Sequence, residues 1–278
     1  ELRNLTQSMG FAVRRNGKVV KWLEPKKAYQ WALDMAETEV MSGTISYNEA
    51  IAHATKQLAA GGLTSIRYES NGRVHYDQAD VAARRAVMTG VNQTCQRYAE
   101  QSMERLETNL VEVSAHGGAR NTGNGPENHA AWQGKVYAWN KSEQPKNTRY
   151  PDFEEVTGYG TGPGLGGWNC RHHYYPYIEG VSSRTYTDKQ LREIDQPPFE
   201  YQGRTYDQYQ ASQKQREIER SIRKQKRIQK AAEALGTEEA AKDATAARAK
   251  IRLLNREYRL FSEAANLPLQ RERTKVVY

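Results

Sequence analysis

Four residues in the middle of the sequence have side chains that commonly bind metal ions. They are His116, His129, Cys170 and His172. One thiolate and three imidazoles form a tetrahedral ligand set that suits Zn²⁺. Their spacing is looser than the paired C-x-x-C pattern of most structural zinc sites. A second interpretation stays open, in which the histidines hydrogen-bond to turns and Cys170 is simply buried.

A glycine repeat precedes Cys170 and raises the question of phosphate binding. Its members are Gly158, Gly160, Gly162 and Gly164. Glycines let backbone amides approach an anion closely, but the repeat lacks the following helix and the Lys-Ser/Thr pair of a nucleotide-binding loop. It predicts a tight, conformationally permissive connection instead. Cys170 beside a histidine base could act as a nucleophile, yet no local signature supports that chemistry.

The segment that holds these residues, 115–180, lacks a helical period and is rich in Gly, His, Tyr and Trp. Long loops are usually functional or disordered, and the aromatic content here indicates a packed, ordered region. A short strand predicted at 110–113 comes directly before it. The strand is therefore expected to anchor the beginning of the segment that holds the polar residues.

The sequence before that strand predicts two β-hairpins and three helices. Asn16-Gly17 and Asn71-Gly72 each lie between apolar or alternating segments, which is typical of a tight hairpin turn. Helices are predicted over 25–41, 46–60 and 77–108, with Ser46 as an N-cap and Gly61-Gly62 ending the second. On the third helix, Cys95 lies on the apolar stripe and is expected to be a buried core residue.

Two long helices are predicted in the last part of the chain, over 206–235 and 237–265, joined at Gly236. The second has apolar residues at alternating steps of four and three, which is a heptad seam. The pattern predicts an antiparallel helical hairpin that packs on itself or on a partner. A partner would bind the face centred on Ile251, Leu254 and Tyr258.

Positive charge is concentrated in these two helices. The chain carries 41 Lys and Arg against 33 Asp and Glu, a formal net charge of +8, and residues 206–278 alone hold 17 against 10. Such a surplus attracts polyanions, although a solvated helix face has the same pattern. The candidate nucleic-acid-binding residues are Lys214, Arg216, Arg220, Arg223, Lys224, Lys226, Arg227 and Lys230.

The composition excludes a transmembrane helix, because only 37% of residues are hydrophobic, the mean hydropathy is -0.91, and no stretch of eighteen consecutive apolar residues occurs. We predict an α+β fold that is mainly helical, with short hairpins and strands. Its expected parts are an N-terminal hairpin segment (1–24), a core domain (25–198) with the His- and Cys-containing region at 110–180, and a basic C-terminal helical hairpin (199–278).

Several stretches resemble the phage minor capsid protein 2 family: 86–94, 110–120, 128–137, 150–153 and 157–172, the last ending in Gly-Trp-Asn-Cys-Arg-His. A more distant likeness is to phage Mu F-type head morphogenesis proteins, in which a second cysteine stands at the position of His172. A Cys-to-His exchange keeps a metal ligand, so this likeness favours zinc. The other matched positions are Arg120, His129, Gly134, Gly167, Trp168, Cys170 and Arg171, with 121–127 inserted between the first two.

The resemblance implies a virion component, namely a minor capsid protein of a tailed phage that assists head morphogenesis near the portal or accompanies DNA on ejection. The expected partners are portal and capsid proteins and packaged double-stranded DNA, which the basic helices would contact without regard to sequence. A structural Zn²⁺ is the expected cofactor, and no enzymatic activity is expected.

Two alternatives stay open. The first is an injected effector enzyme, a nuclease or an ADP-ribosyltransferase-like protein, that uses the His, Arg and Cys cluster around a phosphate. The second is a host-directed adaptor that binds a specific protein through the heptad face.

Overall fold

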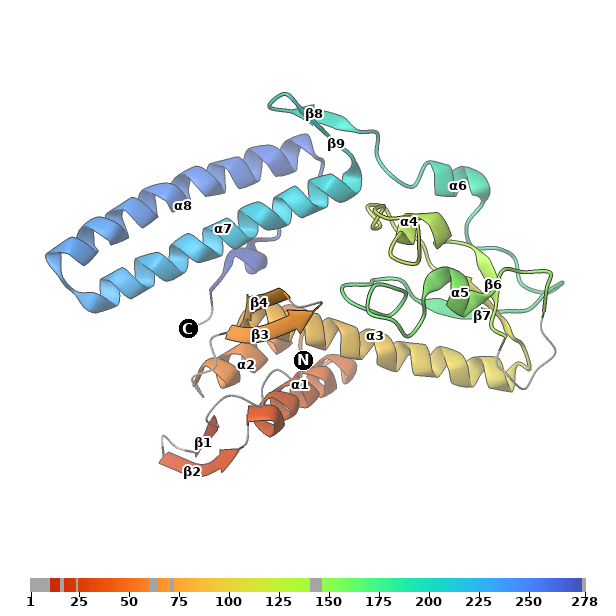
Figure 1. Ribbon diagram of the computed structural model, residues 1–278, viewed down its shortest axis with the longest axis horizontal. Helices are drawn as coiled ribbons and strands as arrows, with labels where there is room; N and C mark the ends of the chain where they lie inside the picture. Colours follow the sequence, from red (N-terminus) through yellow and green to blue (C-terminus); the bar gives the residue numbers. More distant parts are fainter. Residues whose placement is uncertain are drawn as a thin grey trace. The chain divides into compact units, whose positions relative to one another are not determined.

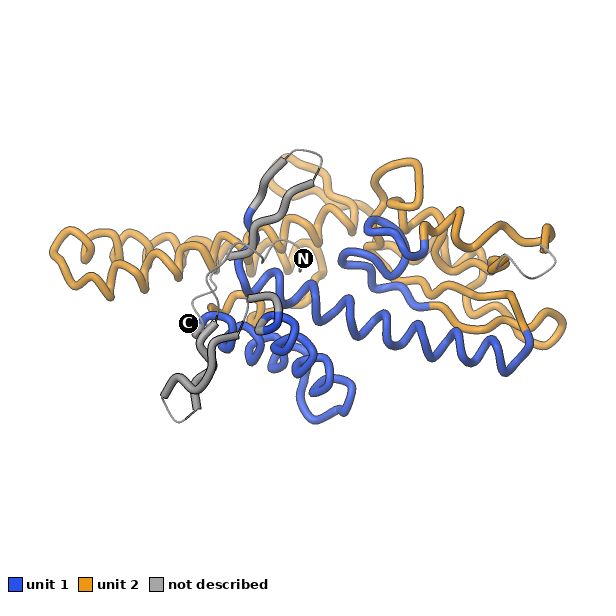
Figure 2. The backbone as a smooth tube through the Cα atoms, turned by 60° about the horizontal axis from the view of Figure 1, so that its bottom comes forward, with its two compact units in different colours: residues 1–107, 159–173, 277–278 blue, residues 108–158, 174–276 orange. Residues whose placement is uncertain are grey.

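A computed structural model describes residues 11–15, 18–23, 25–60, 65–70, 73–140 and 147–276 of the chain. The chain divides into two compact units (Figure 2). The first consists of residues 1–107, 159–173 and 277–278, and the second of 108–158 and 174–276. Helices predominate and the strands form small antiparallel sheets, as the sequence predicted (Figure 1). In the part of the chain that the structure describes, no helix is both long and apolar enough to cross a bilayer.

Both predicted hairpins are present in the first unit. β1 (Phe11–Arg15) pairs antiparallel with β2 (Lys18–Leu23), and β3 (Ser65–Ser70) pairs with β4 (Arg73–Gln78). The Asn-Gly pairs at 16–17 and 71–72, and the glycines at 61–62, lie outside the described residues.

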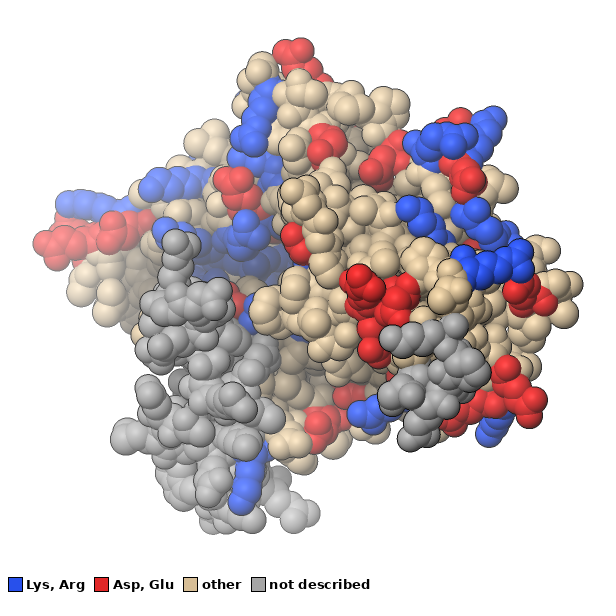
Figure 3. Space-filling view, turned by 45° about the vertical axis from the view of Figure 1, so that its right-hand side comes forward, with Lys and Arg blue, Asp and Glu red and all other residues tan. Residues whose placement is uncertain are grey.

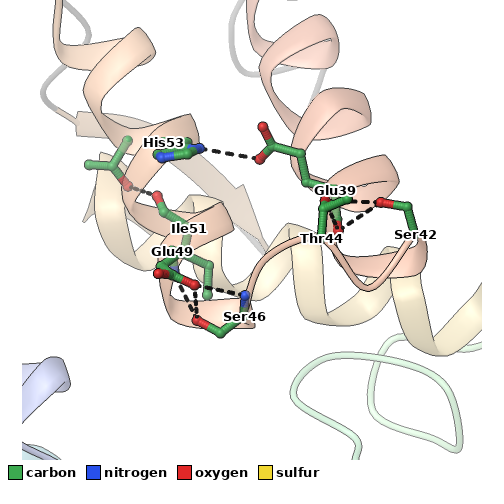
Figure 4. A network of polar contacts seen from close by, with 8 residues as sticks. Glu39, Ser42, Thr44, Ser46, Glu49, Ile51 and His53 are labelled. Carbon is green, nitrogen blue, oxygen red and sulfur yellow. Dashed lines mark hydrogen bonds and ion pairs between the residues drawn. The ribbon is translucent and has the colours of Figure 1, made fainter.

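Three helices form the core of the first unit. α1 (Pro25–Met41) has the predicted bounds, and α2 (Tyr47–Ala60) begins directly after Ser46. Ser46 and Glu49 form a capping box, in which Glu49 N donates to Ser46 Oγ at 3.3 Å and Ser46 N donates to Glu49 Oε2 at 2.9 Å (Figure 4). These bonds satisfy backbone donors that the start of a helix leaves free. The buried core residues are Tyr29, Ala32, Ala36, Ala50, Ile51, Ala54, Leu58, Ala82, Ala83, Val87 and Val91.

The third helix, α3 (Ala79–Arg105), starts slightly later than predicted because residues 77 and 78 belong to β4. Its buried face includes the polar residues Asn92 and Gln96. Cys95 is exposed, so the expectation that it is a core residue was wrong. The physical reason is that the buried face of α3 turns toward Asn92, which contacts the segment 159–173 of the same unit through hydrogen bonds to its backbone.

A three-stranded antiparallel sheet organises the second unit. β5 (Leu110–Val113) is the central strand, between β6 (Val136–Ala138) and β7 (Tyr174–Tyr177). Every residue of β5 is buried, including Glu112 at 2% exposure. The Glu112 carboxylate accepts hydrogen bonds from Thr185 N at 2.8 Å and Thr185 Oγ1 at 3.1 Å. Burial of an acidic side chain in a sheet is tolerated when its oxygens are satisfied in this way.

In the described part of the region after β5, aromatic rings pack together. The rings of Trp139, Phe153 and Tyr174 lie with their centroids 5.1 to 5.7 Å apart. The region also contains three short helices that the sequence pattern did not predict: α4 (His129–Trp132), α5 (Phe153–Thr157) and, beyond β7, α6 (Asp188–Arg192). Helices of four or five residues have no hydrophobic period to recognise.

The second unit ends in the predicted helical hairpin. A small β-hairpin, β8 (Phe199–Tyr201) and β9 (Arg204–Tyr206), leads into α7 (Gln208–Leu235), and α8 (Glu238–Ala264) returns antiparallel to it (Figure 1). Gly236 joins the helices with a φ of 67°, a left-handed conformation that favours glycine. The heptad seam of α8 is buried within the hairpin, where Tyr258 is only 3% exposed. The expected partner-binding face around Tyr258 is therefore already covered.

Candidate functional site

The segment 159–173 is fixed on α3 by side chains of that helix. Asn92 Nδ2 donates to the carbonyl oxygens of Cys170 and His172, each at 3.4 Å, and Tyr159 donates through its hydroxyl to Glu100 Oε1 at 2.8 Å. Asn92 is 4% exposed, so these bonds form in a dry environment where they are worth more than at the surface. One amide thereby holds both backbone positions on which the Cys170 and His172 side chains are mounted.

The glycine repeat folds this segment tightly. A Cβ atom at Gly167 would lie 2.2 Å from the carbonyl oxygen of Gly162, and one at Gly166 would lie 2.7 Å from the side chain of Gln96. Gly166 also has a φ of 74°. Trp168 N donates to Gly162 O at 2.7 Å, which closes the turn. Within the repeat itself, Gly158 and Gly160 have φ values of 60° and 82°, and a Cβ atom at Gly162 would lie 2.7 Å from the Trp168 ring. The expected role of the repeat as a tight connection is therefore confirmed.

Cys170 and His172 lie side by side and face the interior. Their exposures are 6% and 1%, and Cys170 Sγ lies 3.7 Å from His172 Nδ1. Two ligands of one tetrahedral Zn²⁺, at bond lengths of about 2.3 Å to sulfur and 2.05 Å to nitrogen, are about 3.6 Å apart. The observed separation is close to that of two ligands of the same ion, and it is also a hydrogen-bonding distance between a thiol and an imidazole.

His129 is the first residue of α4 and is 3% exposed. Its ring packs against Trp132 in a tilted arrangement, with a centroid distance of 4.6 Å. Trp132 is fixed in turn, because its indole Nε1 donates to Pro126 O at 2.9 Å and its carbonyl accepts from the Tyr137 hydroxyl at 2.7 Å. The imidazole is thus held by an ordered set of aromatic neighbours.

His129, Cys170 and His172 form a buried group that could hold a metal ion, since their ligand atoms all lie within 4.8 Å of one another. Two imidazoles and a thiolate fit Zn²⁺ in the chemistry of the donors. These are three of the four residues that the sequence suggested. His116 is outside the group: its Nδ1 lies 3.0 Å from Gly117 O, and its backbone N–H donates to Gln133 Oε1 at 3.0 Å.

The basic residues of α7 fall into two sets. Arg216, Arg220, Lys224 and Arg227 recur at three- and four-residue steps, opposite the buried Ile218 and Ile222, and so form the outer face of the helix. The other four, Lys214, Arg223, Lys226 and Lys230, lie toward the flanks. In the space-filling view, Lys and Arg side chains follow the hairpin at the left, and acidic side chains join them at its tip (Figure 3).

Contacts within the hairpin engage the flanking cations. Arg223 donates to the carbonyl of Arg273, and Lys226 Nζ donates to Thr274 O at 2.8 Å. Burial, together with the charge of Lys275, lowers the pKa of Lys226. Lys214 and Lys230 lie 3.3 Å and 3.9 Å from carboxylates of Glu217 and Glu233. Charge on α7 is therefore less available to a ligand than the sequence suggested.

A buried polar network between α7 and α8 was not foreseen from the sequence. The Tyr258 hydroxyl donates to Glu219 Oε1 at 2.9 Å and accepts from Gln270 N at 2.8 Å. Gln215 Nε2 donates to Ser262 Oγ at 2.9 Å. The sequence did contain a signal for this network, namely Gln215 and Glu219, which lie four residues apart on the apolar face of α7. Polar residues at such positions need partners on the facing helix.

Comparison with known proteins decides the family. The profile of the family described as phage minor capsid protein 2 matches residues 18–263. The chain belongs to this family. It is therefore a phage structural protein and a component of the virion.

Two curated relatives agree with this assignment. A "Structural protein" of Lactococcus phage LL-H is 30% identical over 233 residues, which are 82% of this chain and 57% of the relative. A "Structural protein" of Lactococcus phage mv4 is 37% identical over 90 residues, 32% of this chain and 63% of the relative. The matches thus cover less than two thirds of the length of each relative. No solved structure matches the chain significantly.

Proposed function

We propose that this minor capsid protein assists head assembly near the portal or accompanies the DNA on ejection, and that its helical hairpin contacts packaged double-stranded DNA. The observation that supports DNA contact is the outer face of α7, where Arg216, Arg220, Lys224 and Arg227 share one side of the helix. A single-sign row of cations interacts with the regularly spaced phosphates of a duplex without reading its sequence.

Binding to a random-sequence duplex across a salt series tests this proposal. Counterion release predicts that log K falls linearly with log salt concentration, with a slope of about -0.9 for each phosphate neutralised. The expected result for the full chain is a steep negative slope that is the same for unrelated duplex sequences. Affinity that is absent at low salt, or that does not change with salt, refutes DNA contact.

We also propose that His129, Cys170 and His172 hold one structural Zn²⁺. The separation of Cys170 Sγ and His172 Nδ1, 3.7 Å, and the burial of the three side chains support this assignment. An ion that binds only the folded state stabilises it, by about 2.7 kcal/mol when the free ion is at a hundred times its dissociation constant. The proposed role of the ion is to hold the fold together, because it would link residues that are distant in the sequence, such as His129 and Cys170.

Elemental analysis of protein purified without chelator tests the metal proposal. About one zinc per chain is expected for the wild type, and much less for Cys170→Ala or His172→Ala. His53→Ala is the matched control, because His53 is half exposed on α2 and pairs with Glu39 instead. His116→Ala is expected to retain the ion. Absence of stoichiometric metal in the wild type, or equal loss in the His53 variant, contradicts the assignment.

A further inference from the structure

The outer side of α8 carries a row of arginines that the basic run on α7 does not include. Arg248, Arg252, Arg256 and Arg259 are all exposed. At about 100° per residue they fall within about 80° of the helix circumference. The row lies away from the buried seam, which includes Ala247, Tyr258 and Phe261.

Three of these arginines have no partner among the described residues. Arg248 lies 3.6 Å from a carboxylate oxygen of Glu233, whereas Arg252, Arg256 and Arg259 make no ion pair or hydrogen bond with any residue in the described ranges. Of the eight cations on α7, by contrast, only Arg220 and Lys224 make no ion pair or hydrogen bond with a residue in those ranges. The largest set of free guanidinium groups on the hairpin is therefore on α8.

Within residues 248–259, acidic side chains do not offset the row, and the next exposed carboxylate on that side of α8 is Glu263, one turn beyond Arg259. Residues 248–259 contain five Lys and Arg against one carboxylate, Glu257. Glu257 is engaged, because its Oε2 accepts a hydrogen bond from the Tyr201 hydroxyl at 3.2 Å. Exposed charge of one sign, repeated at regular steps, suits a ligand with regularly repeated charge of the opposite sign.

The dimensions of the row match a nucleic-acid backbone. Eleven residues separate Arg248 from Arg259, which is a rise of about 16 Å along the helix. One strand of B-DNA presents a phosphate every 3.4 Å of its axis, or about five phosphates over that length. Guanidinium groups bind phosphate oxygens bidentately, which makes arginine better suited than lysine to such contacts.

The apolar residues of α8 favour DNA over an acidic protein as the ligand. Protein interfaces depend on apolar anchors at the centre of the contact. The exposed leucines of this helix, Leu253 and Leu260, lie about a quarter turn away from the middle of the row. A duplex that contacts the arginines would leave both leucines outside the contact.

We propose that the α8 row, Arg248, Arg252, Arg256 and Arg259, is the principal phosphate-contacting surface of the hairpin for double-stranded DNA. This inference rests on the proposed DNA contact but assigns it to a different helix from the one the sequence indicated. The α7 face then makes a smaller contribution through Arg220 and Lys224.

The test compares full-length variants in the salt series with a random-sequence duplex. The α8 variant is Arg252→Gln, Arg256→Gln, Arg259→Gln, and the α7 variant is Arg220→Gln, Lys224→Gln. The matched control, Lys56→Gln, Arg97→Gln, Arg105→Gln, removes the same charge from exposed positions of α2 and α3. Glutamine has nearly the helix propensity of arginine, and circular dichroism checks that helix content is kept.

The α8 variant is expected to bind at least about tenfold more weakly at low salt, and its slope should be shallower by about 2.7, which is three phosphate contacts at 0.9 each. The α7 variant should change the slope less, and the control should change it least. A variant with lysine at the three α8 positions keeps the charge and should recover most of the slope. If the triple glutamine variant fails to fold, the double variant Arg252→Gln, Arg256→Gln takes its place, with a slope expected to be shallower by about 1.8.

The possible failures are distinguishable. If neither the wild type nor any variant binds, DNA contact itself is refuted. If the wild type binds and the α8 variant has the same salt slope, only the assignment to α8 is wrong. The arginine row would then be a candidate for binding an acidic protein surface. If the matched control loses as much as the α8 variant, the effect is one of net charge and the assignment is again refuted.

Discussion

Replacement of Tyr258 by Phe removes one hydroxyl from the interior of the helical hairpin and leaves the aromatic ring in place. That hydroxyl donates to Glu219 Oε1 at 2.9 Å and accepts from Gln270 N at 2.8 Å. Tyr258 is 3% exposed and Glu219 is 2% exposed, so water cannot easily replace the lost partner. The variant therefore leaves a buried carboxylate oxygen and a backbone N–H unsatisfied.

The expected destabilisation follows from these two losses. A hydrogen bond to a charged group contributes about 1.5 to 3 kcal/mol, and a neutral one about 1 kcal/mol. Together they predict that Tyr258→Phe lowers the free energy of unfolding of the hairpin by about 2.5 to 4 kcal/mol. Since domains are stable by only about 5 to 15 kcal/mol, the loss is easily measured.

Hydrogen exchange of α7 and α8 peptides, read by mass spectrometry, is the suitable assay. Tryptophan fluorescence does not report on this part, because residues 199–278 contain no Trp. Tyr201→Phe is the matched control: its hydroxyl also donates to a carboxylate, Glu257 Oε2 at 3.2 Å, but Tyr201 is only partly buried. The control is expected to lose about 1 kcal/mol or less.

Equal exchange in the two variants would refute this reasoning. A second check is the double variant Tyr258→Phe, Glu219→Leu. Replacing both partners by apolar groups removes the unsatisfied carboxylate, so the double variant should be more stable than the sum of the single losses predicts. Additive losses would show that the carboxylate is not the source of the cost.

Two further predictions concern pH and the turn at residues 162–168. Burial of the phenol, with smaller contributions from its neighbours, raises the pKa of Tyr258 from 10.0 to about 12. The folded state therefore holds the phenol proton more tightly than the unfolded state does. The stability that this proton contributes is complete below pH 10 and is lost as the pH rises toward 12. Unfolding of wild type and Tyr258→Phe compared across that range should show a steeper decline in the wild type, and parallel curves would contradict it. Gly167→Ala should destabilise the first unit by about 1 to 3 kcal/mol in thermal denaturation, because its Cβ would meet the Gly162 carbonyl at 2.2 Å. The matched change Gly90→Ala, in the interior of α3, meets only the end of the Glu37 side chain, whose other oxygen accepts from the Thr94 hydroxyl at 2.7 Å. Because that side chain can shift and alanine favours the helix, this change should cost less than Gly167→Ala, and a similar loss at both positions would argue against the steric explanation.

The long elements were predictable because each leaves a local signature. Pro25 at the first helical position and a repeating apolar stripe fixed the bounds of α1. The two Asn-Gly pairs located β1 to β4. The β8–β9 hairpin was missed although Gln202 and Gly203 both have positive φ, because Gln-Gly is a weaker turn signal than Asn-Gly.

The candidate site was predictable in residue type but not in geometry. From the sequence, His116 and His129 were equally good candidates for the metal site. Tertiary contacts alone decide that His129 belongs to the group and His116 does not. The burial of Asn92 and the exposure of Cys95 have the same origin, since the polar carboxamide of Asn92 is needed to hold the backbone of Cys170 and His172. Hydrophobic patterning ranks cysteine above asparagine as a core residue and therefore fails there.

The two ends of the helical hairpin differ in how firmly they are held. At the base, the rings of Phe199, Tyr201 and Tyr206 pack on Phe261 with centroids 5.1 to 5.9 Å apart, whereas the buried cluster at the tip consists only of Ala232, Ala240 and Ala244. Binding a ligand costs conformational entropy wherever side chains and backbone must first be ordered. The α8 arginines at 252, 256 and 259 lie toward the base, so a ligand would meet a surface that is already rigid, and association there would involve little further ordering of the backbone.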